Sequence, residues 1–257
     1  MSRLIYLVYG LICYALFLVA FTYAVGFIGG YDNVVPKAID TGTEGPAPAA
    51  ILVNVLLLSL FAIQHSVMAR REFKSWWKKF VPEPIERSTF VLLSSLLLLL
   101  LYWQWRPMTD IVWQVDHHAG YWALTVLFFT GLLIVLYTTF LVDHFDLFGV
   151  RQVLLHWLGQ PYTHRPFRAP TLYKLCRHPM MVGFIIGFWA TPTMTTGHLL
   201  FALVTTAYIN IAIRLEEREV VMILGDPYER YREQTPMLIP LPFRRKAAPQ
   251  DRSGGTS

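Results

Sequence analysis

The chain has 257 residues, of which 54% are apolar, 15% are aromatic and only 15% are charged. Soluble globular proteins carry about 25% charged residues, so this chain lacks the charge needed to cover a surface that faces water. The apolar content excludes intrinsic disorder, and two cysteines, Cys13 and Cys176, are too few for a disulfide scaffold. The net charge of +5 is better explained by basic residues on one side of a membrane than by binding of nucleic acid.

Apolar segments of the length that crosses a bilayer, roughly 17–25 residues, follow one another along the chain. The first four are 4–28, 51–68, 89–105 and 120–142. Two more, 180–196 with Pro192 inside it and the shorter 199–213, are expected to pair as a hairpin. We therefore predict an all-α fold: a polytopic integral membrane helical bundle of about six transmembrane helices with a C-terminal helical hairpin.

Lysine and arginine are segregated between the two sets of loops. Of the 22 basic residues, only Lys37 and Arg106 fall on one side; the others precede the first span or lie in 69–88, in 143–179 and after residue 213. Because basic residues stay on the cytoplasmic side, both termini are expected in the cytoplasm. The first span follows a single Arg3 and is too long for a signal-peptide core, so we expect it to be retained.

Composition divides the chain into a four-span N-terminal region (1–142), a C-terminal region that contains the hairpin (143–246) and a tail predicted to be disordered (247–257).

Strongly polar residues gather at the predicted cytoplasmic ends of the spans. These clusters are Gln64-His65-Ser66, Asp143-His144-Phe145-Asp146, Arg177-His178-Pro179, and Arg214 with Glu216, Glu217 and Glu219. An enzyme that uses a soluble cytosolic cofactor needs this layout, although ordinary polar helix ends produce part of it.

The sharpest of these clusters is RHPMMVG at 177–183. Pro179 suits the first position of a helix, where free backbone N–H groups attract an anion. Arg177 adds a positive charge that matches a carboxylate, and Gly183 permits close approach of a backbone or a ligand. A helix start with an interfacial arginine and a capping histidine explains the same residues equally well.

Two adjacent carboxylates, Glu216 and Glu217, stand where the last apolar segment ends. Taken alone, they are typical of a solvated helix extension. Across a short hairpin from Arg177 and His178, they complete a site for a zwitterion. In that site the carboxylates would bind an amine or ribose hydroxyls, and the helix start would bind a carboxylate.

His65 lies inside an apolar segment, where a polar residue is often functional, as a substrate, proton, metal or haem ligand. It is also close to Arg70, so an interfacial, hydrogen-bonded histidine is the simpler interpretation. The spacing of Asp143, His144 and Asp146 matches no metal-ligand pattern and favours a capped helix end, so we predict no metal site.

Together these segments resemble a known family. RHPMMVG, a hairpin, EERE at 216–219 and GDPYERY starting nine residues after Glu216 are similar to the C-terminal half of the isoprenylcysteine carboxyl methyltransferase-like family. Upstream, the chain resembles the bacterial methanethiol S-methyltransferases in the segments NVVPKAID, FAIQHSVMARREFKSWW, ERSTFVLLSSL, DHFDLFGVRQV and LYKLCRHPM. The resemblance extends from about residue 33 to residue 240.

The resemblance implies a multi-pass methyltransferase of the bacterial inner (cytoplasmic) membrane. It would use S-adenosyl-L-methionine to convert methanethiol, a small volatile thiol, to dimethyl sulfide. It implies cofactor contacts by His178, Pro179, Met180, Met181 and Glu216. With the residues singled out above, the candidate cofactor-binding set is Arg177, His178, Pro179, Met180, Met181, Gly183, Glu216 and Glu217. The oligomeric state is not predicted.

The chain departs from the prenylcysteine enzymes at two positions. Those enzymes have a tyrosine where this chain has Met181, and their substrate-binding arginine falls by spacing near Ala212; Arg214 is close but not aligned. These differences argue against a prenylated substrate and suit a small acceptor.

Methyl transfer from a sulfonium to a thiolate joins opposite charges, so an apolar pocket that excludes water favours it. Only the thiolate is a strong nucleophile. We therefore expect His178 or His65 to accept the thiol proton and Arg214 or Arg177 to give electrostatic support. In-line positioning is an alternative source of rate.

Three other interpretations stay open. A related membrane methyltransferase would act on another thiol, an isoprenylcysteine or a lipid. A haem-containing, zeta-carotene isomerase-like protein would share the spans and the in-span histidine, but it needs no glutamate-rich segment after the last span. A non-catalytic membrane scaffold would leave the charged clusters as interfacial groups.

Overall fold

The computed structural model describes residues 2–163 and 171–239. Helices make up most of this part of the chain, with two short strands between them. In chain order the elements are α1 (Ser2–Gly29), α2 (Ala47–Ala69), α3 (Arg71–Trp77), α4 (Glu83–Gln104), β1 (Ile111–Gln114), α5 (His118–Val142), α6 (His144–Leu147), α7 (Val150–Leu158), the 3₁₀ turn η1 (Thr171–Lys174), α8 (Pro179–Trp189), β2 (Thr193–Thr195), α9 (Thr196–Leu224) and α10 (Asp226–Gln234).

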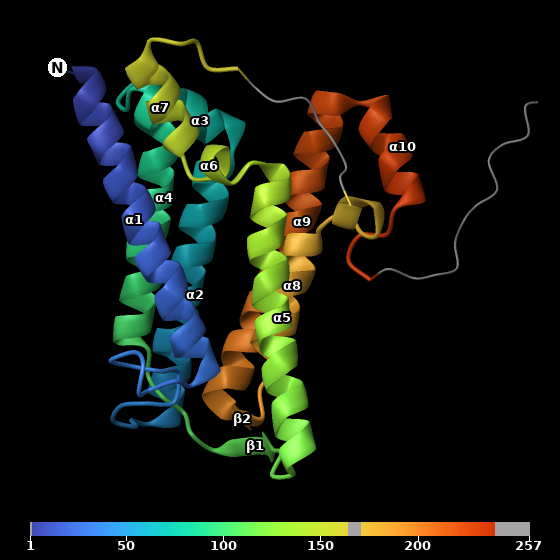
Figure 1. The fold of residues 1–257 in the computed structure, drawn as a ribbon. Coiled ribbons are helices and arrows are strands. Elements are labelled where there is room, and N and C mark those ends of the chain that lie inside the picture. Colours follow the sequence, from blue (N-terminus) through green and yellow to red (C-terminus); the bar gives the residue numbers. More distant parts are fainter. Residues whose placement is uncertain (1, 164–170, 240–257) are drawn as a thin grey trace, which may run out of the picture.

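The long helices alternate in direction, so the chain passes back and forth between two ends of the bundle (Figure 1). The N-terminus, α3, α6, α7 and α10 gather at one end, which we call the charged end. The loop 30–46 and the strands β1 and β2 gather at the other, which we call the strand end. This arrangement agrees with the predicted all-α bundle and its C-terminal hairpin, formed by α8 and α9.

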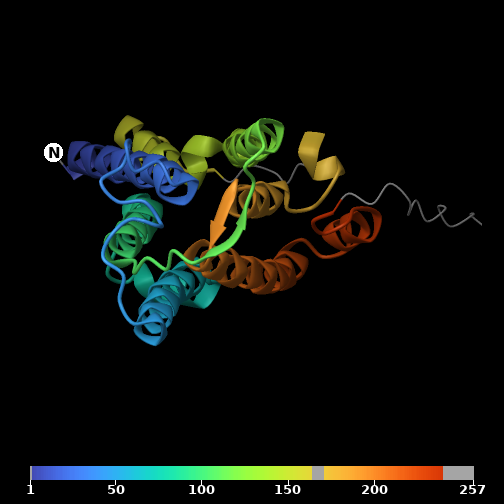
Figure 2. The same cartoon turned by 90° about the horizontal axis from the view of Figure 1, so that it is seen from below.

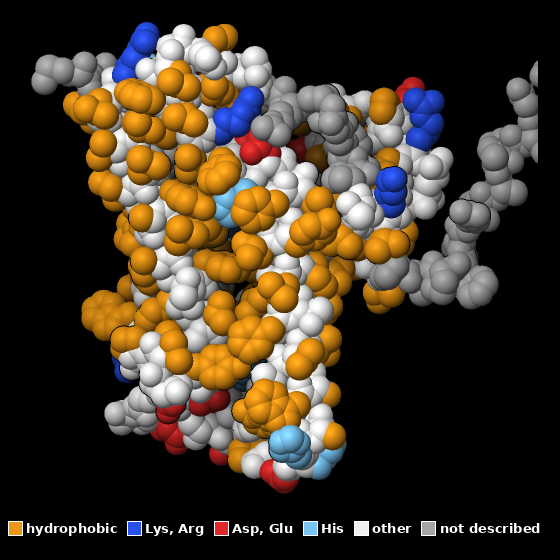
Figure 3. Space-filling model, viewed as in Figure 1, with side chains coloured by type: hydrophobic (Ala, Val, Ile, Leu, Met, Phe, Trp, Pro, Cys, Tyr) orange, Lys and Arg blue, Asp and Glu red, His pale blue; other side chains and the backbone are white. Residues whose placement is uncertain are grey.

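Five helices are long and apolar enough to cross a membrane: α1, α2, α4, α5 and α9. Large apolar side chains cover the lipid-facing flanks of these helices, as the space-filling view shows (Figure 3). The chain is therefore an integral, multi-pass membrane protein by its length and distribution of apolar helices.

The predicted membrane span 180–196 is wrong, because the helix in this segment is too short to cross a bilayer. Helix α8 has only 11 residues, about 16 Å at 1.5 Å per residue, which is roughly half of a hydrocarbon core of about 30 Å. The helix ends at Trp189 because Pro192 follows and β2 pairs antiparallel with β1, with Ile111 opposite Thr195 and Trp113 opposite Met194. The sixth passage is thus a half-length helix joined to a two-stranded ribbon.

Helix α9 is longer than predicted. It has 29 residues and continues past Arg214 to Leu224, so Glu216 and Glu217 lie on the same continuous helix as the apolar span. Seen along the bundle, α8 lies between α5 and α9 (Figure 2). Helix α8 touches α5 through its backbone and is joined to α9 by a hydrogen bond from Trp189 Nε1 to Thr206 Oγ1 at 2.9 Å.

The contact with α5 depends on glycine. A Cβ on Gly183 would lie 2.6 Å from the carbonyl oxygen of Gly131, and a Cβ on Gly131 would lie 2.6 Å from the carbonyl oxygen of Gly183. No real Cβ tolerates such a distance, so these glycines allow the two backbones to touch.

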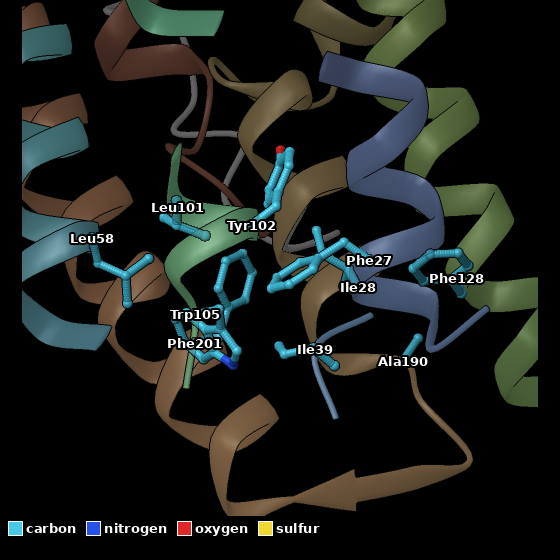
Figure 4. Close-up of a cluster of buried hydrophobic side chains, with 10 residues drawn as sticks. All are labelled: Phe27, Ile28, Ile39, Leu58, Leu101, Tyr102, Trp105, Phe128, Ala190 and Phe201. Atoms are coloured by element: carbon cyan, nitrogen blue, oxygen red, sulfur yellow. The ribbon is translucent and has the colours of Figure 1, made fainter. Parts of the chain in front are cut away.

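The buried core lies toward the strand end (Figure 4). It is built from aromatic rings on different helices: Phe27 of α1 packs against Tyr102 of α4 and edge-on against Trp105, and Trp105 packs edge-on against Phe201 of α9. This cluster holds the two halves of the bundle together at that end.

Two further expectations concern the loops. The predicted capped end at Asp143 is confirmed, because its side chain accepts a hydrogen bond from the backbone N–H of Asp146, the first turn of α6. The boundary at residue 142 coincides with the end of α5, but α5 packs along α8, so the two regions share one bundle. The tail 247–257 lies outside the described residues.

Candidate functional site

The residues at the start of α8 and the charged end of α9 form one buried ionic network. Arg177 Nε donates to Glu217 Oε1 at 2.6 Å and Nη2 donates to Oε2 at 3.1 Å, a bidentate pair. His178 Nε2 lies 2.9 Å from the same Oε1. The side chains of all three are about one-tenth exposed. The sequence analysis placed these residues together, and the structure joins them directly.

The same arginine is hydrogen-bonded to the backbone at the end of α10 and directly after it. Arg177 Nη1 donates to the backbone carbonyls of Arg232 at 3.0 Å and Thr235 at 2.5 Å. The backbone N–H groups of Arg177 and His178 donate to the carbonyls of Pro236 and Met237. Arg177 therefore connects the start of α8 with α9 and with the chain after α10, and these bonds occupy its guanidinium.

Glu217 also fixes the tautomer of His178. Paired with an arginine, the carboxylate is ionised and only accepts hydrogen bonds. His178 Nε2 must therefore carry the proton, and Nδ1 is the basic nitrogen. His178 is the N-cap residue of α8, but its side chain makes no capping hydrogen bond; the alternative of a capping histidine therefore holds for its backbone position only.

Glu216 occupies a different face of α9. Successive helical residues turn by about 100°, which places Glu216 on the side of Tyr208, Ala212 and Glu219. That side faces α2: the hydroxyl of Tyr208 lies 3.1 Å from that of Ser66, and Glu219 forms an ion pair with Arg70. The site thus includes a wall from α2.

Glu216 is exposed by the surface area of the whole residue, but protein atoms surround its carboxylate and partly desolvate it. The carboxylate makes no hydrogen bond or ion pair with any described residue. It lies within electrostatic range of His178, Tyr173 and Tyr208. Burial raises the pKa of Tyr173 to about 12, and the negative charge of Glu216 adds to the shift, so this phenol stays protonated at neutral pH. An open carboxylate surrounded by hydroxyl groups is suited to bind a cation or a polar ligand.

The first turn of α8 supplies the apolar side of the site. The N–H groups of Met181 and Val182 bond to the carbonyl of His178, and the N–H of Met180 makes no bond to a described residue. Met180 and Met181 are half-buried. Met181 shares a helix face with Phe184 and Phe188, so apolar side chains lead from the bundle interior to the charged network.

Among the described residues, the other candidates make no hydrogen bond or ion pair with Glu216. His65 packs between the rings of Phe61 and Phe90, with Nδ1 3.4 Å from Ser94 Oγ, in agreement with a hydrogen-bonded histidine inside the bundle. Arg214 is exposed and stands about 200° from Glu216 around α9. Gly183 is buried in the contact with α5, so its close approach is to a backbone. Within the described residues, no group of three or more metal-binding side chains comes together.

Sequence reasoning missed Tyr208, Tyr173 and the contribution of α2. The spacing of Tyr208 from Glu216, two helical turns, was a usable signal. The contribution of α2 could not be predicted from the sequence, because no local pattern specifies that α2 and α9 are neighbours.

Comparison with known proteins identifies close relatives over nearly the whole chain. The chain is 53% identical over 244 residues to the methanethiol S-methyltransferase of Mycobacterium tuberculosis, covering 95% of this chain and 99% of the relative. It is 53% identical over 245 residues to methanethiol S-methyltransferase 2 of Bradyrhizobium diazoefficiens, covering 95% and 93%.

A more distant relative is nurim of Mus musculus, 31% identical over 182 residues that cover 67% of this chain and 68% of that protein. No protein-family model and no solved structure matches the chain. Identity of about one half along almost the full length of both proteins shows common family membership, and the membrane helices agree with it. The chain belongs to the methanethiol S-methyltransferase family.

Proposed function

We propose that this protein transfers a methyl group from S-adenosyl-L-methionine to methanethiol and so produces dimethyl sulfide. The acceptor follows from the names of its relatives. The donor site is supported by one observation above the others: the open carboxylate of Glu216 lies beside the start of α8, next to the His178–Glu217 pair.

The residues fit the cofactor. S-adenosyl-L-methionine carries an ammonium group, a carboxylate and a sulfonium whose methyl group is electrophilic. Glu216 offers an unpaired carboxylate to a cationic or hydroxyl group of the ligand. The first turn of α8 offers the free N–H of Met180 and the positive end of the helix to a carboxylate. Arg177 and Glu217 act indirectly, by holding this helix start and the chain after α10 in place.

His178 would accept the proton of the thiol. Glu217 holds Nε2–H, so Nδ1 is left to accept a proton, and the carboxylate stabilises the imidazolium that forms. Met181 and Phe184 follow His178 on α8 and add apolar surface to this side of the site, and an apolar surrounding favours a reaction between opposite charges. A thiol as small as methanethiol needs no larger binding surface than this apolar flank.

The test is headspace gas chromatography of membranes that contain the protein, supplied with methanethiol with and without S-adenosyl-L-methionine. We expect dimethyl sulfide only with the cofactor, and a loss of at least about tenfold in cofactor affinity for Glu216→Gln, equivalent to about 1.4 kcal/mol. Arg214→Gln, on the opposite face of α9, is the matched control and should bind the cofactor normally. Cofactor binding without dimethyl sulfide would discard the acceptor; unchanged binding by Glu216→Gln would discard the site.

The protein is further proposed to lie in the inner membrane with the charged end in the cytoplasm, where the cofactor is made. The support is the gathering of basic residues at that end: of the lysines and arginines in the described part of the chain, only Lys37 and Arg106 lie toward the strand end.

A further inference from the structure

A cavity of about 810 Å³ opens at the charged end, between α3, the start of α4 and the turn from α5 to α7. Its lysine and arginine lining residues are Arg71 and Lys74 of α3, Lys78 directly after this helix, and Arg87 of α4. None of the residues of the Glu216 site lines it among the residues described. The proposed methyl transfer therefore leaves this cavity without a role.

Helix α3 is built to turn a basic face toward the cavity. Arg71, Lys74 and Lys78 recur at the i, i+3, i+7 spacing of one helix face. On another face, Phe73 and Trp77 pack against a cluster of buried side chains from α2 and α4. The aromatic anchors fix the rotation of the helix, so the basic face cannot turn away from the cavity.

The charges in the cavity are only partly paired within the described residues. Lys78 binds Glu83 at 2.8 Å, and Asp146 is bound by Arg151 at 3.1 Å. No described carboxylate lies within ion-pair distance of Lys74 or Arg71.

Arg87 is held by one end only. Its Nε donates to the carbonyl of Leu147 at 2.7 Å and its guanidinium lies over the ring of Phe90. The two terminal nitrogens make no hydrogen bond to a described residue. The carboxylate of Glu86 is within electrostatic range of Arg87 and Lys74 but pairs with neither. Burial, followed by the charge of Arg87, lowers the pKa of Lys74, as expected for cations that share a cavity.

The position of α3 indicates where an anion would come from. Trp76 and Phe80 are 49% and 67% exposed. Trp76 lies on the face of α3 opposite the basic residues, and α3 lies at the ends of the membrane helices α2 and α4 (Figure 1). Exposed aromatic residues at the end of a span are typical of the headgroup level of a bilayer. Phosphate is the main anion at that level, and arginine and lysine bind it strongly.

We propose that this cavity binds a phosphate group, with Lys74, Arg71 and the terminal nitrogens of Arg87 as its ligands. At the headgroup level the phosphate of an anionic phospholipid is the expected source, and a soluble phosphate is the other source of the same chemistry.

The test compares lipid retention by the purified full-length protein in native mass spectrometry after addition of phosphatidylglycerol. The wild type should keep one lipid molecule at detergent concentrations that strip the others, and the double variant Arg71→Gln/Lys74→Gln should bind it at least about tenfold more weakly. Lys74→Arg, which keeps the charge, should retain binding. Arg230→Gln removes an exposed charge on α10 and is the matched control.

A parallel arm replaces the lipid with inorganic phosphate and follows the thermal midpoint. Stabilisation of the wild type by phosphate, absent in the double variant, together with no lipid retention would support the site and assign it to a soluble phosphate. Equal lipid retention and equal phosphate response in wild type and double variant would overturn the proposal. Unchanged binding of S-adenosyl-L-methionine by the double variant shows that it is folded and separates this result from a failure of the proposed methyl transfer.

Discussion

Two adjacent glutamates of α9 have opposite surroundings. Glu217 is buried and holds Arg177 and His178, whereas Glu216 is accessible and has no partner among the described residues. A rotation of about 100° along the helix separates the two environments. Both glutamates were predicted to bind the cofactor. We propose that contact for Glu216, which is open, and a positioning role for Glu217, which is bound by Arg177 and His178.

For Glu217→Gln we expect a loss of stability of about 3 kcal/mol, because breaking a buried ion pair costs roughly 3–5 kcal/mol and glutamine still accepts a hydrogen bond. The measurement is the thermal midpoint of the purified protein. Glu216→Gln is the adjacent control and should stay within about 0.5 kcal/mol of the wild type. If the two variants were equally stable, the positioning role of Glu217 would be wrong.

His144 is another residue whose state is fixed by its partners. Thr139 Oγ1 donates to the carbonyl of Leu136 and therefore accepts from His144 Nδ1 at 2.8 Å. The other nitrogen, Nε2, then accepts from the hydroxyl of Tyr14 at 2.7 Å. The ring also stacks on that of Phe140. The imidazole is thus held neutral at the end of the bundle.

Burial lowers the pKa of His144, against a smaller opposing effect of Asp143. The folded-state pKa lies below the unfolded value of about 6.5, so its contribution to stability is present above that pH and is lost as the pH falls toward the folded pKa. We expect the thermal midpoint to fall between pH 7.5 and pH 5, and to fall less in His144→Gln. An equal fall of the thermal midpoint in both proteins would contradict this prediction. The other histidines are present in both proteins, so their contributions cancel in the comparison.

At the scale of elements, the short helix α8 organises the site. Its first turn carries His178 and Met181, and its middle packs on α5 through paired glycines. Because α8 is half-length, its start lies deeper than the ends of its neighbours, and α10 with the chain after it covers that start through the bonds to Arg177. The site is therefore formed where a short helix leaves room between long ones.

The glycine contact gives a matched pair of substitutions. Gly183→Ala would place a Cβ 2.6 Å from a backbone oxygen of α5, whereas the nearest atom to a Cβ on Gly187 is a leucine methyl at 3.6 Å. We expect Gly183→Ala to lose about 1–3 kcal/mol through overpacking. Gly187→Ala should be neutral or slightly stabilising. Thermal midpoints of both variants decide the matter, and a stable Gly183→Ala protein would show that the contact is looser than described.

At the scale of the whole molecule, charge and apolar surface are arranged along the bundle axis. Apolar side chains cover its middle, and basic residues gather at the charged end (Figure 3). Both proposed ligand sites, the Glu216 site and the phosphate cavity, lie at that end. A cofactor from the cytosol and a thiol dissolved in the membrane would then reach the same region from different directions.

Cysteine labelling tests this orientation. Cys13 and Cys176 are buried, so the background is low. Val34→Cys introduces an exposed thiol in the strand-end loop, and Glu233→Cys introduces one on α10. In intact cells a membrane-impermeant maleimide should label only the first, and both after permeabilisation. Labelling of the second in intact cells would reverse the proposed topology.

The features of the fold that could be predicted from the sequence are those that depend on neighbouring residues, and the features that could not depend on contacts between distant segments. The apolar segments, the segregation of basic residues and the RHP and EERE segments are local features. The membrane bundle and the family followed from them, and so did the proximity of the RHP and EERE segments, which the structure joins through Arg177, His178 and Glu217. The half-length of α8 and the ribbon of β1 and β2 were missed, whereas the helix extension that carries Glu216 and Glu217 was one of the interpretations of the sequence. The two missed features arise from pairing between segments some 80 residues apart, such as Ile111 with Thr195.

The sequence by itself therefore determined that the protein is a membrane bundle and which chemical groups stand at its charged end, because hydropathy and charge act residue by residue along a span. Only the tertiary structure decided what each group contacts. Glu217 is bound by Arg177 because α8 packs beside α9, and Glu216 is open because α2 supplies the opposite wall. Helix rotation and the choice of neighbours are set by packing between distant segments, which no local pattern specifies.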